Sequence, residues 1–195
     1  MSAICIIPAR AGSRRIPGKN KKLFHGKPII LYSLEAARES GLFSRIVVST
    51  DDLDIVQIAT DFGAEVHYRD AETARDEVGT QEVVKHVLMD HFSIEERGGY
   101  TCCIYPTAPL MSLLDLCKGY MELEDRRFAF SVGVNPLRDA GQFYWGRTLA
   151  FTIGYPLIGA HTGLIHIDDN RVCDINTQED WDRALRMYEE LHKND

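Results

Sequence analysis

Residues 3–20 have the sequence AICIIPARAGSRRIPGKN, and this stretch decides the class of fold. Residues 3–9 are a short apolar run rich in isoleucine that ends at proline and glycine signals, which is typical of a buried parallel strand. The loop that follows contains Gly12 and a group of cations, which are Arg10, Arg14, Arg15 and Lys19. A buried strand followed at once by such a loop predicts an α/β protein whose ligand site lies at the carboxyl edge of the sheet.

The rest of the chain alternates between helical and extended patterns. Helices are expected over residues 28–41, 52–63, 81–91 and 113–123, and strands at 45–50, 64–68, 100–105 and 128–132. This alternation predicts a Rossmann-like, three-layer α/β architecture with a mostly parallel sheet covered on both faces. After Val134 the pattern is β-rich, with short strands expected at 143–145, 150–153 and 164–167 and a final helix over 179–192 that Thr177 caps.

Length and composition indicate one soluble domain over residues 1–195. The chain has 195 residues, of which 45% are hydrophobic, and this composition excludes a membrane protein or a disordered one. Its net charge is −7 and it has no basic tract, so we expect no binding to nucleic acid through the phosphates. The N-terminus enters a strand without a charged leader, and we therefore expect a cytoplasmic protein with no membrane partner.

The cysteines and histidines do not form a metal-binding pattern. Of the five cysteines, three lie in apolar strand-like runs, so we interpret them as reduced core residues. The chain has no Cys-x-x-Cys, and its seven histidines have no His-x-x-x-His spacing. The sequence therefore predicts no structural zinc site.

The cationic loop after the first strand has two interpretations. It can bind an anion, because Gly12 lets the backbone approach a polyanion and Ser13 adds a hydroxyl donor beside the cations. It can also be a solvated surface loop, but its position after the first strand favours the anion site. Neither common phosphate loop is present: Gly12 and Gly18 are too far apart for Gly-x-Gly-x-x-Gly, and Asn20 follows Lys19 where a P-loop has Ser or Thr.

The motifs of this region are similar to those of one enzyme family. Ala9-Arg10-x-Gly12-Ser13, Lys19-Asn20 and Val48-Ser49-Thr50-Asp51 resemble the cytidylyltransferases that activate nonulosonic, sialic-type acids as CMP derivatives. Residues 104–109 (IYPTAP) and 139–146 (DAGQFYWG) are most similar to the pseudaminic acid branch. The resemblance runs over essentially the whole chain. It implies a nucleotidyltransferase fold in which the anomeric hydroxyl of the sugar attacks the α-phosphorus of CTP, pyrophosphate leaves and Mg²⁺ holds the phosphates.

The resemblance also implies a role for individual residues. The catalytic cations would be Arg10 and Lys19. The nucleotide site would consist of Ala9, Arg10, Gly12, Ser13, Arg14, Lys19, Asn20, Arg69 and Thr80, the sugar site of Tyr105, Gln142 and Tyr144, and the metal site of Asp174 and Asn176. From the residues alone, Tyr144 lies in an aromatic trio and is more typical of a core, whereas Gln142 beside Gly141 has little reason to be buried unless it binds something.

The chain departs from the family's pattern in two places. The family usually has Asp-x-Asp before its last helix, whereas this chain has Asp174-Ile175-Asn176, so Asn176 either offers a neutral carbonyl to Mg²⁺ or serves only as an N-terminal helix residue. The family also carries an insertion with its dimerisation arm and part of the sugar pocket, which is missing here between Arg138 and Asp139. The homodimer that the resemblance implies would then lack its interlocking arm.

Two alternatives to the CMP-sugar synthetase stay open at this point. One is a catalytically impaired nucleotide-binding paralogue that has kept the cationic loop but lost turnover through Asn176 and the missing arm. The other is a nucleotidyltransferase for a different sugar.

Overall fold

The computed structural model describes residues 3–70, 72–75, 77–126, 128–136 and 138–193. Within these ranges a seven-stranded sheet runs through the molecule in the order β5-β4-β1-β6-β8-β7-β9. Its strands are β1 (Ala3–Pro8), β4 (Phe43–Thr50), β5 (Glu65–Tyr68), β6 (Tyr100–Ile104), β7 (Phe130–Val134), β8 (Asp139–Arg147) and β9 (Thr162–His166). Strand β8 is antiparallel to both of its neighbours, while the other pairs in the sheet are parallel, which confirms the mostly parallel α/β fold.

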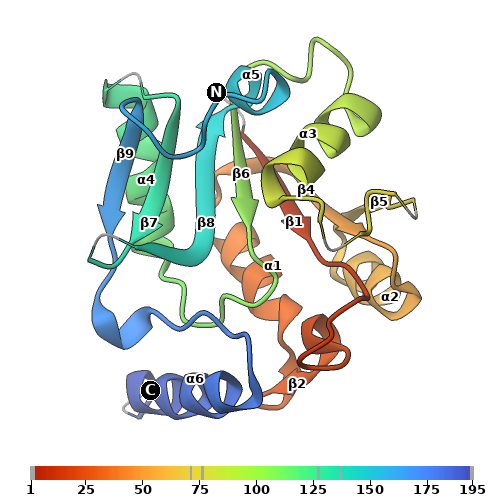
Figure 1. Ribbon diagram of the computed structural model, residues 1–195, viewed down its shortest axis with the longest axis vertical. Helices are drawn as coiled ribbons and strands as arrows, with labels where there is room; N and C mark the ends of the chain where they lie inside the picture. Colours follow the sequence, from red (N-terminus) through yellow and green to blue (C-terminus); the bar gives the residue numbers. More distant parts are fainter. Residues whose placement is uncertain (1–2, 71, 76, 127, 137, 194–195) are drawn as a thin grey trace.

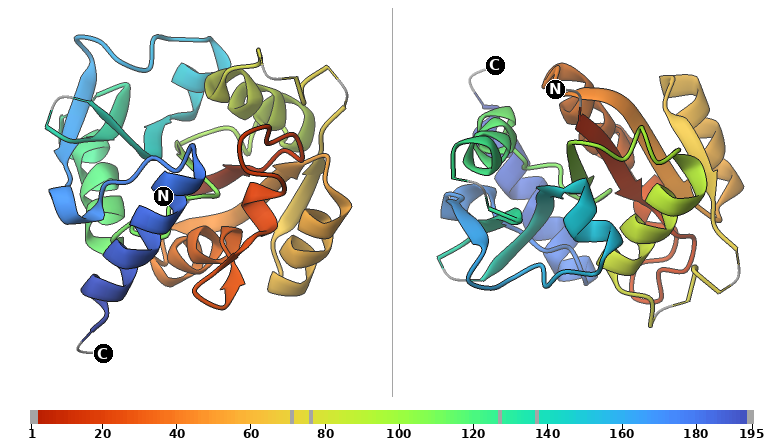
Figure 2. Two further views of the ribbon diagram at one scale, coloured as in Figure 1. Left: turned by 60° about the horizontal axis from the view of Figure 1, so that its bottom comes forward. Right: turned by 90° about the horizontal axis from the view of Figure 1, so that it is seen from above.

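Helices cover both faces of this sheet, as Figures 1 and 2 show. One face packs against α1 (Ile30–Glu39), α2 (Leu53–Phe62) and α4 (Leu113–Arg126), and the other against α3 (Thr80–His91) and α5 (Thr148–Thr152). Strand β1 contributes side chains to the cores on both faces of the sheet, because successive side chains of a strand point to opposite faces. Cys5 and Ile7 join the first core, and Ile4 and Ile6 join the second.

A third, smaller core anchors the C-terminal helix α6 (Gln178–Leu191). Trp181 of α6 packs edge-on against Phe24, which lies in the short hairpin of β2 (Leu23–Phe24) and β3 (Lys27–Pro28). Thr177 caps α6 as expected, since its hydroxyl accepts from the Asp180 backbone N–H and the Asp180 carboxylate accepts from the Thr177 N–H in return. The helix therefore holds the segment before it against the cationic loop.

One expected strand is wrong. Residues 150–153 lie in and just after helix α5, in which Ala150 and Phe151 are buried and Leu149 is exposed. A short apolar run can be a strand or a buried helical turn, and periodicity alone does not separate the two. The other expected elements are present with shifts of a few residues, such as β7, which covers Phe130–Val134.

Most of the cysteines are core residues, as the sequence predicted. All five cysteines are free, and four of them are buried: Cys5, Cys102, Cys103 and Cys173. Burial raises the pKa of the Cys5 and Cys102 thiols well above the ordinary value, so both stay protonated. Among the residues that the structure describes, no helix has the length and apolar character needed to cross a bilayer.

Candidate functional site

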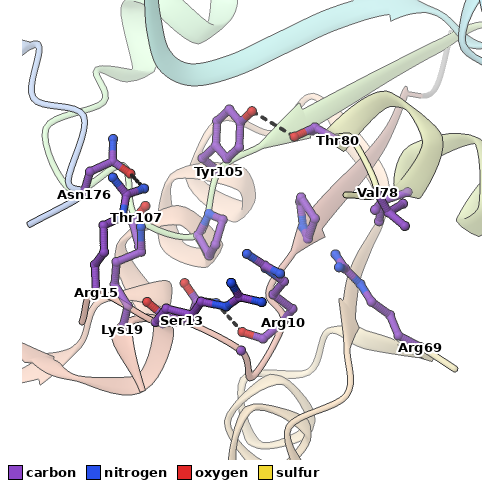
Figure 3. Close-up of a pocket in the computed structure, with 16 residues that line it drawn as sticks. Arg10, Ser13, Arg15, Lys19, Arg69, Val78, Thr80, Tyr105, Thr107 and Asn176 are labelled. Atoms are coloured by element: carbon purple, nitrogen blue, oxygen red, sulfur yellow. Dashed lines mark hydrogen bonds between the residues drawn. The ribbon is translucent and has the colours of Figure 1, made fainter. Parts of the chain in front are cut away.

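The carboxyl ends of the parallel strands meet at one edge of the sheet and form a cleft of about 400 Å³. Strand β1 leads into the cationic loop, β5 into Arg69 and β6 into Tyr105, and all three segments line the cleft (Figure 3). Thr80, at the start of α3, and Asn176, just before α6, close it from the other sides. The fold thus brings together residues from five separate parts of the chain.

The end of β4 holds the start of the cationic loop in place. The Ala9 N–H donates to the Ser49 carbonyl at 2.8 Å, and the Thr50 hydroxyl donates to the Ala9 carbonyl at 2.6 Å. The Ala11 N–H then donates to Asp51 Oδ1 at 2.7 Å. The Val48-Ser-Thr-Asp51 motif therefore has a positioning role, because it fixes where the backbone leaves the sheet.

The far end of the loop turns back through Gly18 and the short 3₁₀ helix η1 (Lys19–Lys21). Gly18 has a φ of 61°, which is a left-handed conformation that glycine adopts without strain. The Asn20 amide donates to the Arg10 carbonyl at 3.0 Å. The two ends of the loop are therefore joined, and the loop keeps its shape around the cleft.

Two cations of the loop contact the segment before α6. Lys19 Nζ donates to the Ile175 carbonyl at 2.7 Å, and Arg15 Nη2 donates to Asn176 Oδ1 at 2.8 Å. Burial lowers the pKa of Lys19, while the nearby Asp174 carboxylate opposes this effect. A partly desolvated ammonium gains free energy when an anion binds next to it, which is what a phosphate in the cleft would supply.

Arg69 faces the cleft from the side opposite Lys19 (Figure 3). Its Nε donates to the Ser49 hydroxyl at 3.0 Å, and burial lowers the pKa of Arg69 to about 10. The lining side chains of the described chain carry no carboxylate, and the cations among them are Arg10, Arg14, Arg15, Lys19 and Arg69. In a chain of net charge −7, this local excess of positive charge indicates a polyanionic ligand.

A chain of hydroxyl groups forms another wall of the cleft. The Tyr105 hydroxyl lies 2.9 Å from Thr80 Oγ1 and 3.3 Å from the Tyr144 hydroxyl, and the Tyr144 hydroxyl donates to Asp139 Oδ2. Burial raises the pKa of Tyr105, so its hydroxyl stays neutral and can donate or accept a hydrogen bond. This wall suits a ligand with several hydroxyl groups better than it suits a phosphate.

The structure brings most of the expected site residues to the cleft. Those that line it are Arg10, Gly12, Ser13, Arg14, Lys19, Asn20, Arg69, Thr80, Tyr105 and Asn176. The expected residues outside the lining are Ala9, Gln142, Tyr144 and Asp174.

Three of these four residues are buried behind the cleft. Ala9 is fully buried beneath the loop. Gln142 is 4% exposed and its amide donates to the Arg171 carbonyl, while Tyr144 lies behind Tyr105 and touches it through the hydroxyl. In this structure the side chains of Gln142 and Tyr144 therefore support the residues around the cleft.

Some lining residues were not among the expected site residues. Arg15 was expected only as one of the loop cations, but its bond to Asn176 connects the loop to the C-terminal segment. Thr107 belongs to the IYPTAP motif and lies two residues beyond Tyr105, so the motif could have indicated it. Val83 of α3 and Val78, two residues before this helix, carry no chemical signal in the sequence, and only tertiary packing places them there.

Asp174 and Asn176 differ in their fitness to hold a divalent cation. Asp174 is exposed and offers a carboxylate beside Lys19, which suits a hard cation that also binds phosphate oxygens. The Asn176 side chain is already used on both sides, since Oδ1 accepts from Arg15 and Nδ2 donates to Asp174 Oδ2. Asp174 therefore offers the anionic oxygen that a hard divalent cation prefers, whereas Asn176 offers a neutral carbonyl oxygen that already accepts one hydrogen bond.

Comparison with known proteins agrees with this geometry. The family model described as "Cytidylyltransferase" matches residues 4–151. The pseudaminic acid cytidylyltransferase of Campylobacter jejuni (strain 81-176) is 30% identical over 229 positions, which cover 99% of each chain. The CMP-N,N'-diacetyllegionaminic acid synthase of Legionella pneumophila is 37% identical over 113 positions, which cover 56% of this chain and 47% of that one.

A solved structure extends the comparison to the fold. The CMP:2-keto-3-deoxy-manno-octonic acid synthetase complexed with CTP superposes with a TM-score of 0.75 at 16% identity, over 98% of this chain and 100% of that chain. The alignment with the Campylobacter protein runs over 229 positions, more than the 195 residues present here, so that relative has residues without a counterpart in this chain. The sequence motifs, the family model and the Campylobacter relative lead to one conclusion: the chain belongs to the cytidylyltransferase family that forms CMP-activated nonulosonic acids.

Proposed function

We propose that this protein transfers the cytidylyl group of CTP to the anomeric hydroxyl of a nonulosonic acid, with pseudaminic acid as the preferred acceptor. The new bond joins the sugar oxygen to the α-phosphorus, the bond from the α-phosphorus to the bridging oxygen breaks, and pyrophosphate leaves. The observation that carries this proposal is the cleft itself, where loop cations on one side face neutral hydroxyl groups on the other.

The cationic side of the cleft fits the triphosphate. Phosphoryl transfer needs positioning and charge neutralisation more than a strong base. Lys19 and Arg10 would neutralise the charge that develops on the leaving pyrophosphate, and Ser13 would donate to a phosphate oxygen. The bond from Lys19 to the Ile175 carbonyl aims the ammonium before the nucleotide arrives, so little reorganisation is needed when it binds.

The hydroxyl wall fits the sugar. Tyr105 and Thr80 present hydroxyl groups whose hydrogen bonds run back through Tyr144 to the Asp139 carboxylate. A chain of this kind orients each hydroxyl, and it offers a route by which the proton of the attacking hydroxyl can be shared with Asp139. Gln142 would act indirectly, by holding the segment that leads to Asp174.

Mg²⁺ is the cation we propose for this site. Asp174 would hold it together with phosphate oxygens of CTP, since Mg²⁺ is commonly bound through one or two carboxylates and the phosphates of its substrate. When bound, the cation supplies additional charge neutralisation on the triphosphate. The residues of the chain supply the remaining steps, which are binding, orientation and proton placement.

The experiment that tests this function follows pyrophosphate release from CTP, Mg²⁺ and pseudaminic acid. We expect release with the native chain and a loss of at least a hundredfold in kcat/KM for Lys19→Ala. Lys22→Ala is the matched control, because Lys22 also contacts the C-terminal segment, through Gln178, but does not line the cleft. No release above the Lys19→Ala background would remove the proposed activity.

Asn176 decides between this function and a protein that only binds the nucleotide. The Asn176 side chain bonds to Arg15 and to Asp174. Asn176→Asp would therefore place a second carboxylate beside Asp174, at the position where the family has one. For a working synthetase we expect a lower Mg²⁺ concentration at half-maximal rate. If the native chain binds CTP without turnover and the variant gains turnover, the nucleotide-binding alternative is correct.

A further inference from the structure

A cluster of two imidazoles and a carboxylate lies outside the cleft, between β5 and α3. His67 is the third residue of β5, and His86 and Asp90 lie one turn apart on α3. His86 Nδ1 is 2.9 Å from Asp90 Oδ2, and His67 Nε2 is 3.7 Å from the same oxygen. The three potential ligand atoms all lie within 4.8 Å of one another.

The two separations that involve Asp90 are close to those of a tetrahedral metal site. Zinc bonds to imidazole nitrogen and carboxylate oxygen are about 2.0–2.2 Å long, so two ligand atoms of a tetrahedral site are about 3.4 Å apart. The observed distances of 2.9 and 3.7 Å lie on either side of that value. The side chains of His86 and Asp90 are 40% and 53% exposed, so both have room to turn toward a bound ion.

Two further observations point to a ligand at this position. His86 Nδ1 is buried, and among the described residues it has no aligned hydrogen bond, although Asp90 lies 2.9 Å away. His67 is held from behind, because its Nδ1 lies 3.2 Å from Ser49 Oγ and its Nε2 faces Asp90. A hydrogen bond on the second nitrogen is how metal-binding histidines are commonly oriented.

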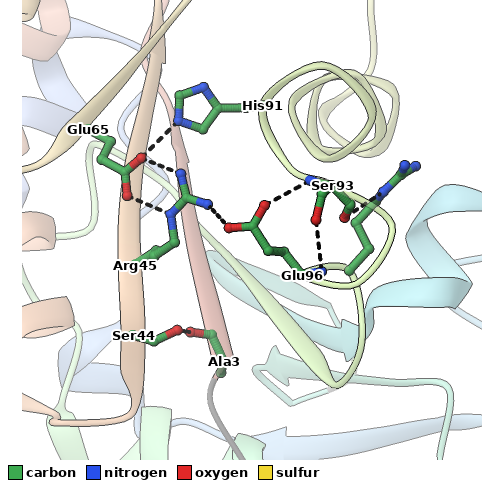
Figure 4. A network of polar contacts seen from close by, with 8 residues as sticks. Ala3, Ser44, Arg45, Glu65, His91, Ser93 and Glu96 are labelled. Atoms are coloured by element: carbon green, nitrogen blue, oxygen red, sulfur yellow. Dashed lines mark hydrogen bonds and ion pairs between the residues drawn. The ribbon is translucent and has the colours of Figure 1, made fainter.

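We propose that His67, His86 and Asp90 bind a divalent transition metal ion such as Zn²⁺, with solvent in the fourth position. Imidazole nitrogen is a poor ligand for Mg²⁺, so this site would be chemically distinct from the one at Asp174. His91 is not part of it, because its Nε2 lies 3.0 Å from Glu65 Oε2 in a separate network (Figure 4). The proposal does not depend on the function proposed above.

The hydrogen bonds of Ser49 connect this site to the cleft. A metal ion on His67 Nε2 requires the proton of the ring to be on Nδ1, from which it is donated to Ser49 Oγ. The same hydroxyl oxygen accepts from Arg69 Nε at 3.0 Å. Occupancy of the metal site and the placement of Arg69 are thus linked through one side chain.

The test is a titration of the metal-free, full-length chain with Zn²⁺ against a fluorescent chelator. We expect His86→Ala and Asp90→Asn to weaken Zn²⁺ binding at least tenfold. Asp90 is exposed and His86 is partly exposed on α3, and circular dichroism checks that both variants are folded. His166→Ala is the matched control, because it removes an exposed histidine of β9 and should leave the affinity unchanged.

Two results would overturn the site. One is equal Zn²⁺ affinity in the native chain and in both α3 variants. The other is a Co²⁺ complex whose absorption contains a thiolate charge-transfer band, since that would place the metal on a cysteine. For the orienting role of Ser49 on His67, we expect Ser49→Ala to weaken Zn²⁺ binding about tenfold, and unchanged affinity in that variant would disprove this role.

Discussion

At the scale of single residues, the partial burial of two cations, Lys19 and Arg69, is the most important feature of this site. Lys19 and Arg69 are held by hydrogen bonds to Ile175 and Ser49, and burial lowers the pKa of both side chains. Burial disfavours the charged form of each cation in the empty cleft. A polyanion reverses that effect, so nucleotide binding and protonation of Lys19 favour each other.

The first prediction concerns the pH dependence of nucleotide binding. Because the pKa of Lys19 is lowered, CTP affinity should fall as the pH rises through that lowered value, while the ordinary lysine pKa is 10.5. Lys19→Arg should move this fall to higher pH, since a guanidinium keeps its proton longer. Isothermal titration calorimetry at a series of pH values above neutral measures the CTP affinity, and Lys22→Arg is the control. The same profile in native and Lys19→Arg protein would contradict the prediction.

At the scale of elements, a polar network joins β4, β5 and the end of α3 (Figure 4). Arg45 Nε donates to Glu65 Oε1 at 2.7 Å and Arg45 Nη1 to Glu96 Oε1 at 2.6 Å. His91 Nε2 lies 3.0 Å from Glu65 Oε2. The hydrogen bond from Arg45 is the main reason why the pKa of Glu65 is lowered to about 2, and that from His91 adds to it.

The second prediction is that this network gives the protein an acid-sensitive stability. The folded-state pKa of Glu65 is below its ordinary value of 4.5, so ionised Glu65 stabilises the fold fully above about pH 4.5, and this contribution is lost as the pH falls towards 2. Urea unfolding midpoints should therefore drop less steeply over this range in Glu65→Gln than in the native chain. Glu190→Gln on the exposed face of α6 is the control, and an equal drop in all three proteins would refute the argument.

The third prediction concerns the packing of α4 against the sheet. A Cβ at Gly119 would lie 2.6 Å from Trp145 Cδ1 and 3.0 Å from Phe143 Cε2, so the helix can approach this closely only with glycine there. Gly119→Ala should lower the free energy of unfolding by about 1–3 kcal/mol, which is typical of overpacking. Gly159→Ala is the control, since a Cβ there meets nothing within 4 Å. Chemical denaturation measures the free energy of unfolding of both variants. An unchanged free energy in Gly119→Ala would show that α4 can move away from the sheet.

At the scale of the whole molecule, the turn between β7 and β8 lies where the resemblance places the dimerisation arm. Val134 pairs with Asp139, and the Asn135 N–H donates to the Arg138 carbonyl at 2.7 Å. The two strands are therefore joined by a tight connection, and the cleft between β1, β5 and β6 is formed without an inserted segment.

The fourth prediction concerns the choice of nucleotide at this cleft. CTP at about 100 times its dissociation constant should add roughly 2.7 kcal/mol to the free energy of unfolding and raise the melting temperature. UTP and ATP at the same concentration should raise it less, because the matching family model is that of cytidylyltransferases. Thermal shift measurements compare the three nucleotides, and equal shifts would favour a nucleotidyltransferase with a different substrate.

The fold and the cationic half of the site were predictable because their signals are local. An apolar run followed by Gly12 and several cations identifies β1 and its loop, and in a parallel sheet that position is already the ligand edge. Thr177 and Asp180 likewise determine the start of α6 through bonds within four residues of chain. Such features depend on neighbours in the sequence, so the residues themselves specify them.

The sequence by itself therefore determined the order of the elements apart from α5, the cationic loop and the family. Only the tertiary structure decided that Gln142 and Tyr144 are buried behind the cleft, because β8 inserts antiparallel between β6 and β7 and pairs with residues of β6 that lie about forty positions earlier. Only the tertiary structure brought His67 to His86 and Asp90, where the spacing of histidines predicted no metal site. Strand pairing and helix packing are long-range contacts, and no local pattern encodes which distant side chains they place side by side.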